Sequence, residues 1–283
     1  MLRKILRYTI ITVIVGLLID LYVPVKYNPF KTVTENLPRE SFVRITKVVT
    51  VNVCETKKRK NKKINVCIEG SYGVTASGFS VGQAGNGTYI MSADHVCSTT
   101  AENVKRYQVS ELDKIFNQPK IEIAKTEIVA LDIHGEEHPM KVVGTQSDGD
   151  LCLLYAEDVK IKAIPIAQTT PRIGEKVYNL AAPVGYSFPN MIPILEGYYS
   201  GLKPSGFQIF TIPAMGGSSG SPVVNDNYEV VGMIIQMVNE FNDISISPMR
   251  VAIKKFIKKT IKEHKATLSS SCECSQSKEE KNE

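Results

Sequence analysis

Apolar and polar positions change their period along the chain, and from residue 41 onward the pattern is typical of β-strands. Short runs of β-branched and aromatic residues alternate with polar turns that contain glycine. The first series of predicted strands comprises residues 42–53, 72–81, 89–93, 121–133, 141–143 and 151–155. The second series comprises residues 163–167, 176–182, 194–202, 207–212, 222–225 and 230–237. Two series of similar length predict a mainly β protein with a pair of β-barrels or sandwiches.

Helical spacing of apolar residues occurs at two places in this β background. Residues 99–119 carry four large apolar side chains at helical spacing, which predicts a short inserted helix. Residues 248–265 predict an amphipathic α-helix that closes the β domain, with Ser247 as its N-cap and Pro248 in its first turn. Lysines fill the other face of this helix, and binding of that face to a membrane surface is the alternative. The polar residues 266–283 are expected to be disordered.

Residues 1–23 have the pattern of a membrane-targeting segment. Three basic residues among the first seven precede a nearly continuous apolar run. Because no alanine for a small-residue cleavage site precedes Ala76, we expect an uncleaved signal anchor that forms one transmembrane helix. The basic cluster would keep the N-terminus in the cytoplasm and place the rest of the chain outside it. A cleaved leader and a buried apolar strand are the alternatives, and the proline-containing residues 24–40 predict a linker.

Composition and charge exclude few classes of function and change the predicted architecture only slightly. The chain has 283 residues, of which 43% are hydrophobic and 22% charged, as in ordinary globular proteins. Much of the basic excess behind the net charge of +5 lies in two runs, residues 57–63 and 254–265. No phosphate-binding glycine loop, zinc-type cysteine pair or RNA-recognition motif accompanies these runs, so nucleic acid is not expected as a partner.

The six cysteines fall into three pairs along the sequence. Cys54 and Cys67 bracket the first basic run and predict a disulfide at the base of a hairpin, provided that the compartment is oxidising. Cys97 and Cys152 lie in apolar runs and are interpreted as simple buried side chains. The last two cysteines lie in the polar tail, where a surface disulfide, metal capture and no role all remain open.

Residues 216–222, Gly-Gly-Ser-Ser-Gly-Ser-Pro, are the first candidate for chemistry. Flexible glycines can hold a serine on a turn beside N–H groups that point at one spot. Acyl transfer needs this combination of a nucleophile and donors for the developing oxyanion. A serine nucleophile also needs a base and a group that orients the base.

The base and the acid have few candidates. His95 directly follows an apolar strand, whereas the other three histidines lie at a charged hairpin tip or in the C-terminal helix. Asp150 opens an apolar strand, where a carboxylate is costly unless something accepts its charge. Asp148 shares the face of Asp150 and competes with it, whereas Asp94 would point away from His95 in an extended segment.

Four blocks of sequence resemble those of the chymotrypsin-fold serine peptidases, especially the HtrA-like and glutamyl-endopeptidase-like branches. The blocks are residues 77–79 with 91–96, residues 132–144 with 150–154, residues 174–185, and residues 217–223. The resemblance covers about residues 70–260, and its order of motifs assigns the base to His95, the acid to Asp150 and the nucleophile to Ser219. It implies two six-stranded antiparallel β-barrels, about residues 41–158 and 159–246, within a peptidase domain of residues 41–265.

The resemblance also implies a mechanism and a substrate class. The backbone N–H groups of Gly217 and Ser219 would form the oxyanion hole, and the substrate would be a protein or peptide. No metal or organic cofactor is implied. The residues expected to line the pocket for the P1 side chain are Pro213, Ile235, Gln236 and Met237.

The chain departs from both branches in ways that limit the resemblance. HtrA-like proteins usually carry a PDZ domain after the closing helix, whereas only the polar residues 266–283 follow it in this sequence, so regulation through a PDZ domain is not implied. The strand after the nucleophile lacks the histidine of glutamyl endopeptidases, so a small or medium apolar P1 residue is expected rather than glutamate. A peptidase fold without activity that serves as a binding module is the alternative to an active enzyme.

Overall fold

The computed structural model describes residues 36–59, 62–100, 120–238 and 241–279, and all features below belong to the compact unit Pro38–Glu283. The predicted anchor, most of the predicted linker and the helix predicted within residues 99–119 lie outside the described residues. In the described part of the chain, no helix is both long and apolar enough to span a bilayer.

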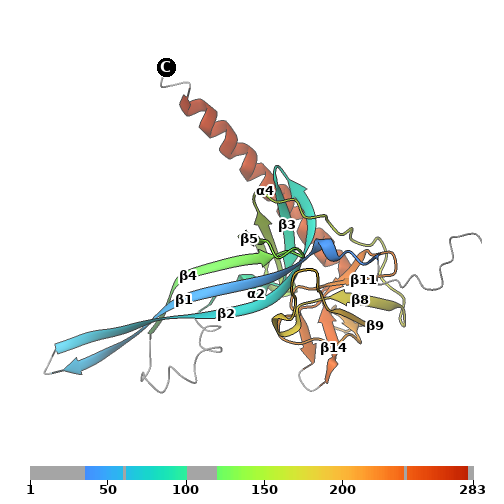
Figure 1. Cartoon of the computed structure of the whole chain (residues 1–283), viewed down its shortest axis with the longest axis horizontal. Coiled ribbons are helices and arrows are strands. Elements are labelled where there is room, and N and C mark those ends of the chain that lie inside the picture. The colour runs from blue at the N-terminus through green and yellow to red at the C-terminus, as the bar shows by residue number, and fades with distance from the viewer. Residues whose placement is uncertain (1–35, 60–61, 101–119, 239–240, 280–283) are drawn as a thin grey trace, which may run out of the picture. The chain divides into compact units, whose positions relative to one another are not determined.

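Two antiparallel sheets form the β unit (Figure 1). The first sheet consists of β1 (Phe42–Arg59), β2 (Lys62–Ala84), β3 (Gly87–Ser92), β4 (Lys120–Leu131), β5 (Glu137–Pro139), β6 (Lys141–Gln146) and β7 (Leu151–Ala156). The second consists of β8 (Lys176–Leu180), β9 (Ile194–Leu202), β10 (Gln208–Phe210), β11 (Pro222–Val224), β12 (Val230–Met233), β13 (Gln236–Val238) and β14 (Phe241–Ser247). The strand orders are β5-β4-β1-β2-β3-β7-β6 and β12-β11-β8-β9-β10-β14-β13.

Each sheet curls until its two edges meet in one stretch of chain. In the first sheet, the edge strands β5 and β6 are separated only by Met140, whose N–H donates to the Ile128 carbonyl oxygen at 2.9 Å. In the second, the edge strands β12 and β13 are separated only by Ile234 and Ile235. Their N–H groups donate to carbonyl oxygens of different neighbouring segments, those of Ser221 and Ile246, both at 3.0 Å.

Six strands were predicted for each barrel, whereas each sheet has seven strands in the described part of the chain. In each sheet, one stretch of chain forms both edge strands. This stretch is interrupted at the point where its pairing changes from one neighbouring strand to another. The predicted strand 230–237 is one of these interrupted segments, because it comprises β12 and β13.

Two further strand predictions need correction. Residues 163–167 form no strand but a single bridge between Ile166 and Val230, because Pro165 has no N–H to donate to a ladder. The strand β14 was not predicted, since its first three residues are exposed and two of them, Asn242 and Asp243, are polar. Its second half is buried and pairs with β10.

The β1–β2 hairpin is longer than the pattern predicted, because the basic residues continue the pairing. The register runs from Phe42–Phe79 to Arg59–Lys62, and its outer part extends beyond the rest of the sheet (Figure 1). The predicted Cys54–Cys67 disulfide is present and joins two directly paired residues.

The core of the first sheet consists of large, fully buried apolar side chains. They include Phe42, Ile45, Phe79, Tyr89, Ile90, Met91, Leu151, Leu153 and Leu154. A separate cluster around Phe210, Tyr199 and Ile212 fills the second sheet. Each sheet thus buries its own inner face, as expected from the alternation of residues along the strands.

Short helices connect the strands, and one long helix ends the unit. The short ones are η2 (Arg39–Ser41), α2 (Asp94–Cys97), η3 (Ser147–Gly149) and η4 (Pro183–Gly185). The C-terminal helix α4 (Arg250–Glu279) contacts β6 and β7 of the first sheet and β12 of the second. It continues to Glu279, through most of the residues for which disorder was predicted.

The start of α4 differs from the prediction. The helix begins at Arg250 rather than at Pro248, because the Ser247 hydroxyl accepts the Met233 N–H at 2.8 Å and does not cap the helix. Arg250 donates to the Ala167 carbonyl oxygen at 2.7 Å. His264 lies within the helix, and its Nδ1 lies 2.9 Å from the Tyr89 hydroxyl.

Candidate active site

His95 lies on α2, a single helical turn that directly follows the buried strand β3. The other three residues of this turn, Asp94, Val96 and Cys97, are buried. The His95 side chain is 42% exposed. The three buried residues therefore hold the turn in place while the imidazole faces outward.

Asp150 faces His95 from the opposite side of the site. It ends η3 in the left-handed region, at φ 51° and ψ 50°, and the buried strand β7 begins at the next residue. Aspartate tolerates this backbone conformation better than most residues do. Its Oδ1 accepts the backbone N–H of His95 at 2.9 Å, and its Oδ2 lies 2.7 Å from His95 Nδ1. Asp148 lines the same cavity, but the carboxylate that binds the imidazole is that of Asp150.

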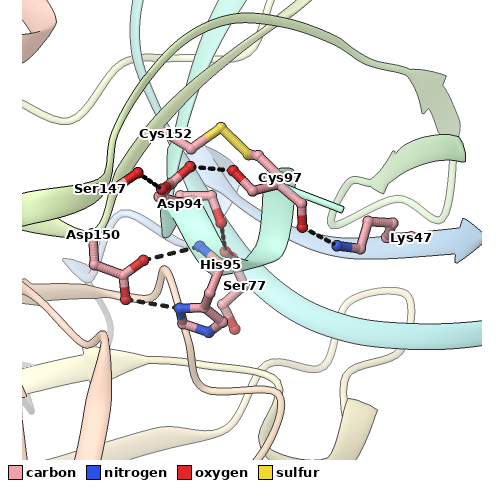
Figure 2. The surroundings of a disulfide bond; sticks show 10 residues. Lys47, Ser77, Asp94, His95, Cys97, Ser147, Asp150 and Cys152 are labelled. Atoms are coloured by element: carbon pink, nitrogen blue, oxygen red, sulfur yellow. Dashed lines mark hydrogen bonds and ion pairs between the residues drawn. A yellow bond between two sulfur atoms is a disulfide. The ribbon is translucent and has the colours of Figure 1, made fainter. Parts of the chain in front are cut away.

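Asp94, the neighbour of His95, points inward. Its Oδ1 accepts the Ser98 hydroxyl at 2.5 Å and its Oδ2 accepts the Ser147 hydroxyl at 2.7 Å. Lys47 Nζ donates to the Ser98 carbonyl oxygen at 3.0 Å, and burial lowers the pKa of Lys47 to about 8 although Asp94 acts in the opposite direction. These contacts connect α2 to β1 and to η3 (Figure 2).

Cys97 and Cys152 form a second disulfide, so their interpretation as separate buried thiols was wrong. Ser92 at the end of β3 pairs with Cys152 on β7, and the turn of α2 then carries Cys97 back over that strand. The bridge lies beside the His95–Asp150 pair (Figure 2).

Ser219 lies in the turn between residue 212 and β11, and it differs from the two serines beside it. Ser218 and Ser221 are fully buried, with 0% exposure. The Ser218 hydroxyl accepts the Met215 N–H at 3.3 Å, and the Ser221 hydroxyl accepts from Asn179 Nδ2 at 2.8 Å. Ser219 is partly exposed and lines a cavity, so it is the accessible hydroxyl of the three.

The turn has a backbone shape that only glycine allows at two positions. Gly217 and Gly220 have φ of +98° and +85°. A Cβ at Gly217 would overlap the carbonyl oxygen of Ala182, and one at Gly220 would overlap that of Ser77. Gly216, in contrast, has open space around it.

Ser77, on β2 of the first sheet, holds this turn of the second. Its N–H donates to the Ser219 carbonyl oxygen at 2.9 Å, and its hydroxyl donates to the Gly217 carbonyl oxygen at 2.8 Å. The same hydroxyl accepts the Ala182 N–H at 2.9 Å. The turn therefore depends on contacts between the two sheets.

The N–H groups of Gly217 and Ser219 were predicted to bind an oxyanion. In the described part of the chain, neither donates a hydrogen bond to another protein group. Their neighbours are satisfied, since Ser218 donates to Met215 at 2.9 Å and Gly220 donates to Ile234 at 2.7 Å. The two predicted donors therefore have no hydrogen-bond acceptor among the described residues.

Two cavities share Gln236 as a lining residue. The larger, of about 660 Å³, is lined by His95 and Asp150. The smaller, of about 200 Å³, contains Ser219 and is otherwise lined by Ala214, Met215, Gly216, Ile234, Gln236 and Met237.

Of the four residues predicted for the P1 pocket, the structure places two in the smaller cavity. Gln236 and Met237 line it, whereas Ile235 lines the larger cavity and Pro213 lines neither. The residues that the sequence did not indicate are Ala214, Met215, Gly216 and Ile234. Proximity to Ser219 in the chain was a usable signal for the first three.

One group of possible metal ligands exists in the described residues, Asp132, Glu136 and His138. Asp132 is already satisfied by its neighbours, because its Oδ1 accepts the N–H groups of His134 and Glu136 and its Oδ2 lies 3.1 Å from His138 Nε2. Burial alone would raise the pKa of Asp132, but these hydrogen bonds outweigh it and lower the pKa. The geometry fits a closed turn, and His138, which was expected at a charged hairpin tip, has a mostly buried side chain.

A comparison with known families agrees with this arrangement. The trypsin-like peptidase domain matches residues 76–233, more than half of the chain. The chain belongs to the trypsin-like peptidase family. The matched region contains His95, Asp150 and Ser219. No curated protein matches the sequence.

Proposed function

We propose that the protein is a serine endopeptidase in which Ser219 is the nucleophile, His95 the base and Asp150 the group that orients the base. The observation that carries the proposal is the His95–Asp150 pair, which leaves the Nε2 side of the imidazole facing away from the carboxylate. The accessible Ser219, rather than buried Ser218 or Ser221, supports the choice of nucleophile.

The reaction begins when Ser219 Oγ attacks the carbonyl carbon of a peptide bond. The Oγ proton moves to His95 Nε2, while Nδ1–H donates to Asp150 Oδ2 and so keeps the imidazole in the tautomer that can accept. The tetrahedral intermediate breaks the C–N bond, and His95 gives its proton to the leaving amine. Water then attacks the acyl-enzyme by the same sequence of proton transfers and releases the acid.

The oxyanion of the intermediate is assigned to the N–H groups of Gly217 and Ser219, which have no acceptor among the described residues. Removal of one such donor typically costs about 3–4 kcal/mol in the transition state. The turn fixes both donors before the substrate arrives, so little reorganisation is needed during the reaction.

The smaller cavity is assigned to the P1 side chain. Among the described residues, no charged one lines it, and its volume of about 200 Å³ suits a small or medium apolar group. Profiling of cleaved peptide libraries should therefore give Ala, Val, Leu or Met before the cleaved bond. A preference for Glu or Arg would contradict this assignment.

The activity is tested with a fluorophosphonate probe, which labels an activated serine covalently. We expect labelling of the full chain at Ser219, its loss in Ser219→Ala and a sharp fall in His95→Ala. Ser200→Ala is the matched control, because Ser200 is an exposed serine of the same sheet on β9. Absence of labelling in the folded wild-type protein would favour a binding module without activity.

We further propose that residues 1–23 anchor the protein in a membrane, with the N-terminus in the cytoplasm and the peptidase domain outside. The basic and apolar pattern of this segment and two disulfides in the domain support an oxidising location. A reporter fused after Glu283 that is active only outside the cytoplasm would agree with this topology. A reporter active only in the cytoplasm would contradict it.

A further inference from the structure

We propose that the Cys97–Cys152 disulfide and the Asp94–Ser147 hydrogen bond act together as a clamp that positions His95 against Asp150. This proposal rests on the proposed function of His95 and Asp150. The clamp consists of Asp94, Cys97, Ser147 and Cys152, none of which takes part in the proposed proton transfers. Asp94 and Ser147 line the larger cavity together with His95 and Asp150.

The four clamp residues flank the catalytic pair on both chain segments. Asp94 immediately precedes His95 and Cys97 lies two residues after it, both on α2. Ser147 lies three residues before Asp150 and Cys152 two residues after it. The Asp94–Ser147 hydrogen bond therefore joins the two segments on the N-terminal side of His95 and Asp150, and the disulfide joins them on the C-terminal side (Figure 2).

The turn that carries His95 needs such external support. It has four residues and no side-chain cap at its N-terminus, and one isolated helical turn is unstable because nucleation costs more than its first hydrogen bond returns. Asp150 is likewise held in a left-handed conformation at the end of a three-residue turn. Neither segment fixes its catalytic side chain by its own backbone structure.

The clamp also removes a competing acceptor. Asp94 is adjacent to His95, but both of its carboxylate oxygens accept serine hydroxyls, at 2.5 and 2.7 Å. The imidazole is therefore left to Asp150. A displacement of about 1 Å between catalytic groups lowers rates about 10²-fold, so loss of the clamp is expected to act on turnover.

The first test uses the two disulfides as matched partners. Cys97→Ser/Cys152→Ser is expected to lower the rate constant of fluorophosphonate labelling about 10²-fold, whereas Cys54→Ser/Cys67→Ser should change it less than twofold. Circular dichroism at the assay temperature establishes that each variant is folded. Equal labelling rates in the two folded variants would overturn the clamp.

A second readout separates positioning from general stability. In the wild-type protein, the proton between His95 Nδ1 and Asp150 Oδ2 should give a far-downfield NMR signal that disappears in His95→Ala. That signal should weaken in Ser147→Ala, together with a fall of about tenfold in kcat and little change in KM. A persistent signal and unchanged kcat would contradict a positioning role, even if the disulfide variant does not fold.

Reduction of the wild-type protein gives an independent measurement. A dithiol supplies two electrons and two protons per disulfide and is itself oxidised to a disulfide. Cys54–Cys67 lies on the exposed hairpin and should open first without loss of labelling, whereas labelling should fall only as the buried Cys97–Cys152 opens. Thiol alkylation with mass spectrometry follows each bridge.

The clamp and the proposed function fail in different ways. If oxidised wild-type protein is not labelled at all, the peptidase activity is wrong. If it is labelled and keeps its labelling rate after Cys97–Cys152 has opened, only the clamp is wrong.

A second inference rests on a different region, a groove between α4 and the loop at residues 165–168. The groove has a volume of about 640 Å³. Its apolar lining consists of Val81, Pro165, Ile166, Ile257 and Ile261. Four lysines of α4 also line it, Lys254, Lys258, Lys262 and Lys265. We propose that this groove binds an acidic peptide segment that carries apolar side chains.

The distribution of charge favours a peptide over other anionic ligands. The four lysines lie within residues 254–265 of the helix, eleven residue steps or about 16 Å at a rise of 1.5 Å per residue. No acidic residue of the described chain lines the groove. An extended peptide of about five residues covers that length, whereas a single carboxylate or phosphate head reaches only one end. Binding to a bilayer surface is favoured by apolar side chains that protrude from the protein. The apolar side chains described above line a concave groove instead.

The test measures fluorescence anisotropy of a labelled peptide with alternating Glu and Leu. Lys258→Glu/Lys262→Glu should weaken binding at least tenfold. Lys255→Glu/Lys259→Glu changes the same charge on residues of α4 that do not line the groove, and it should weaken binding less than threefold. Ile261→Ser should weaken binding without a change in charge.

Three outcomes would overturn the groove proposal. Equal losses in the two charge-reversed variants would show attraction to the helix as a whole. Binding to phosphatidylglycerol vesicles without binding of the peptide would assign the lysines to a lipid surface. Absence of binding to either ligand would leave the lysines as a solvated rim.

Discussion

The two halves of the candidate site are held by different kinds of bond. His95 and Asp150 lie on segments that are joined by a disulfide and by side-chain hydrogen bonds within the first sheet. Ser219 lies on a turn whose shape comes from two glycines and from backbone groups, and part of its support comes from Ser77 on the other sheet. The base side should therefore respond to side-chain and redox changes, and the nucleophile side to backbone changes.

The largest effect is expected from the side-chain half. In Asp150→Asn, an amide N–H₂ faces His95 Nδ1 and favours the tautomer that cannot accept the Ser219 proton, so kcat should fall about 10⁴-fold. Asp148→Asn removes the same charge from the same cavity and should lower kcat less than tenfold. Steady-state kinetics on a chromogenic peptide decides between them. Equal losses would mean that the charge of the cavity matters rather than the bond to His95.

The backbone half is tested with Gly220→Ala. The left-handed strain and the overlap with the Ser77 carbonyl oxygen together should lower the free energy of unfolding by about 2–5 kcal/mol. Gly216→Ala lies on the same turn in open space and should change it by less than about 0.5 kcal/mol. Urea denaturation measures both variants. Similar stabilities would show that the turn tolerates a different backbone shape.

The link between the halves is tested with Ser77→Ala. This change leaves the Ala182 N–H and the Gly217 carbonyl oxygen without their buried partner and should destabilise the protein by about 1–3 kcal/mol. Labelling of Ser219 should also slow. Ser80→Ala on the same strand also removes a buried hydroxyl, one bonded to Ile161, and should cost stability without slowing the labelling of the folded protein. Slowing in both variants would make the effect one of general stability.

The smallest effect concerns Lys47, beneath α2. Because burial lowers its pKa from 10.5 to about 8, the unfolded chain binds more protons than the folded protein between these pH values. The free energy of unfolding should therefore rise with pH over this range, relative to Lys47→Met. Denaturation curves of both proteins at pH 7.0, 8.5 and 9.5 check the sign. Parallel pH dependences would mean that Lys47 is not the cause.

Much of the arrangement could be predicted from sequence. Alternating patterns identified most strands, and the order of motifs singled out His95, Asp150 and Ser219 for a site. The structure brings His95 and Asp150 into contact and leaves Ser219 as the accessible serine of its turn.

The remaining features depend on contacts between residues distant in the chain. The Cys97–Cys152 bridge requires that β3 pairs with β7 and that α2 turns back, and no local pattern contains that information. Asp94 points away from His95, as predicted, but the segment is a helical turn rather than extended, and the bonds of Asp94 to Ser98 and Ser147 were not predicted. The interruptions at Met140 and at Ile234 follow from closure of each sheet, which strand propensity does not encode.

The support of the nucleophile turn by Ser77 has a consequence for the order of events during synthesis. Ser77 and Gly217 are 140 residues apart in the chain. At about 5–20 residues per second, a ribosome needs roughly 7–28 seconds to make the intervening segment. During that interval Ser77 has already been made, and His95 and Asp150 follow it, while Ser219 and its turn are still missing. If Ser219 is the nucleophile, as proposed, a nascent chain gains its activity only after the second sheet has been made and has met the first.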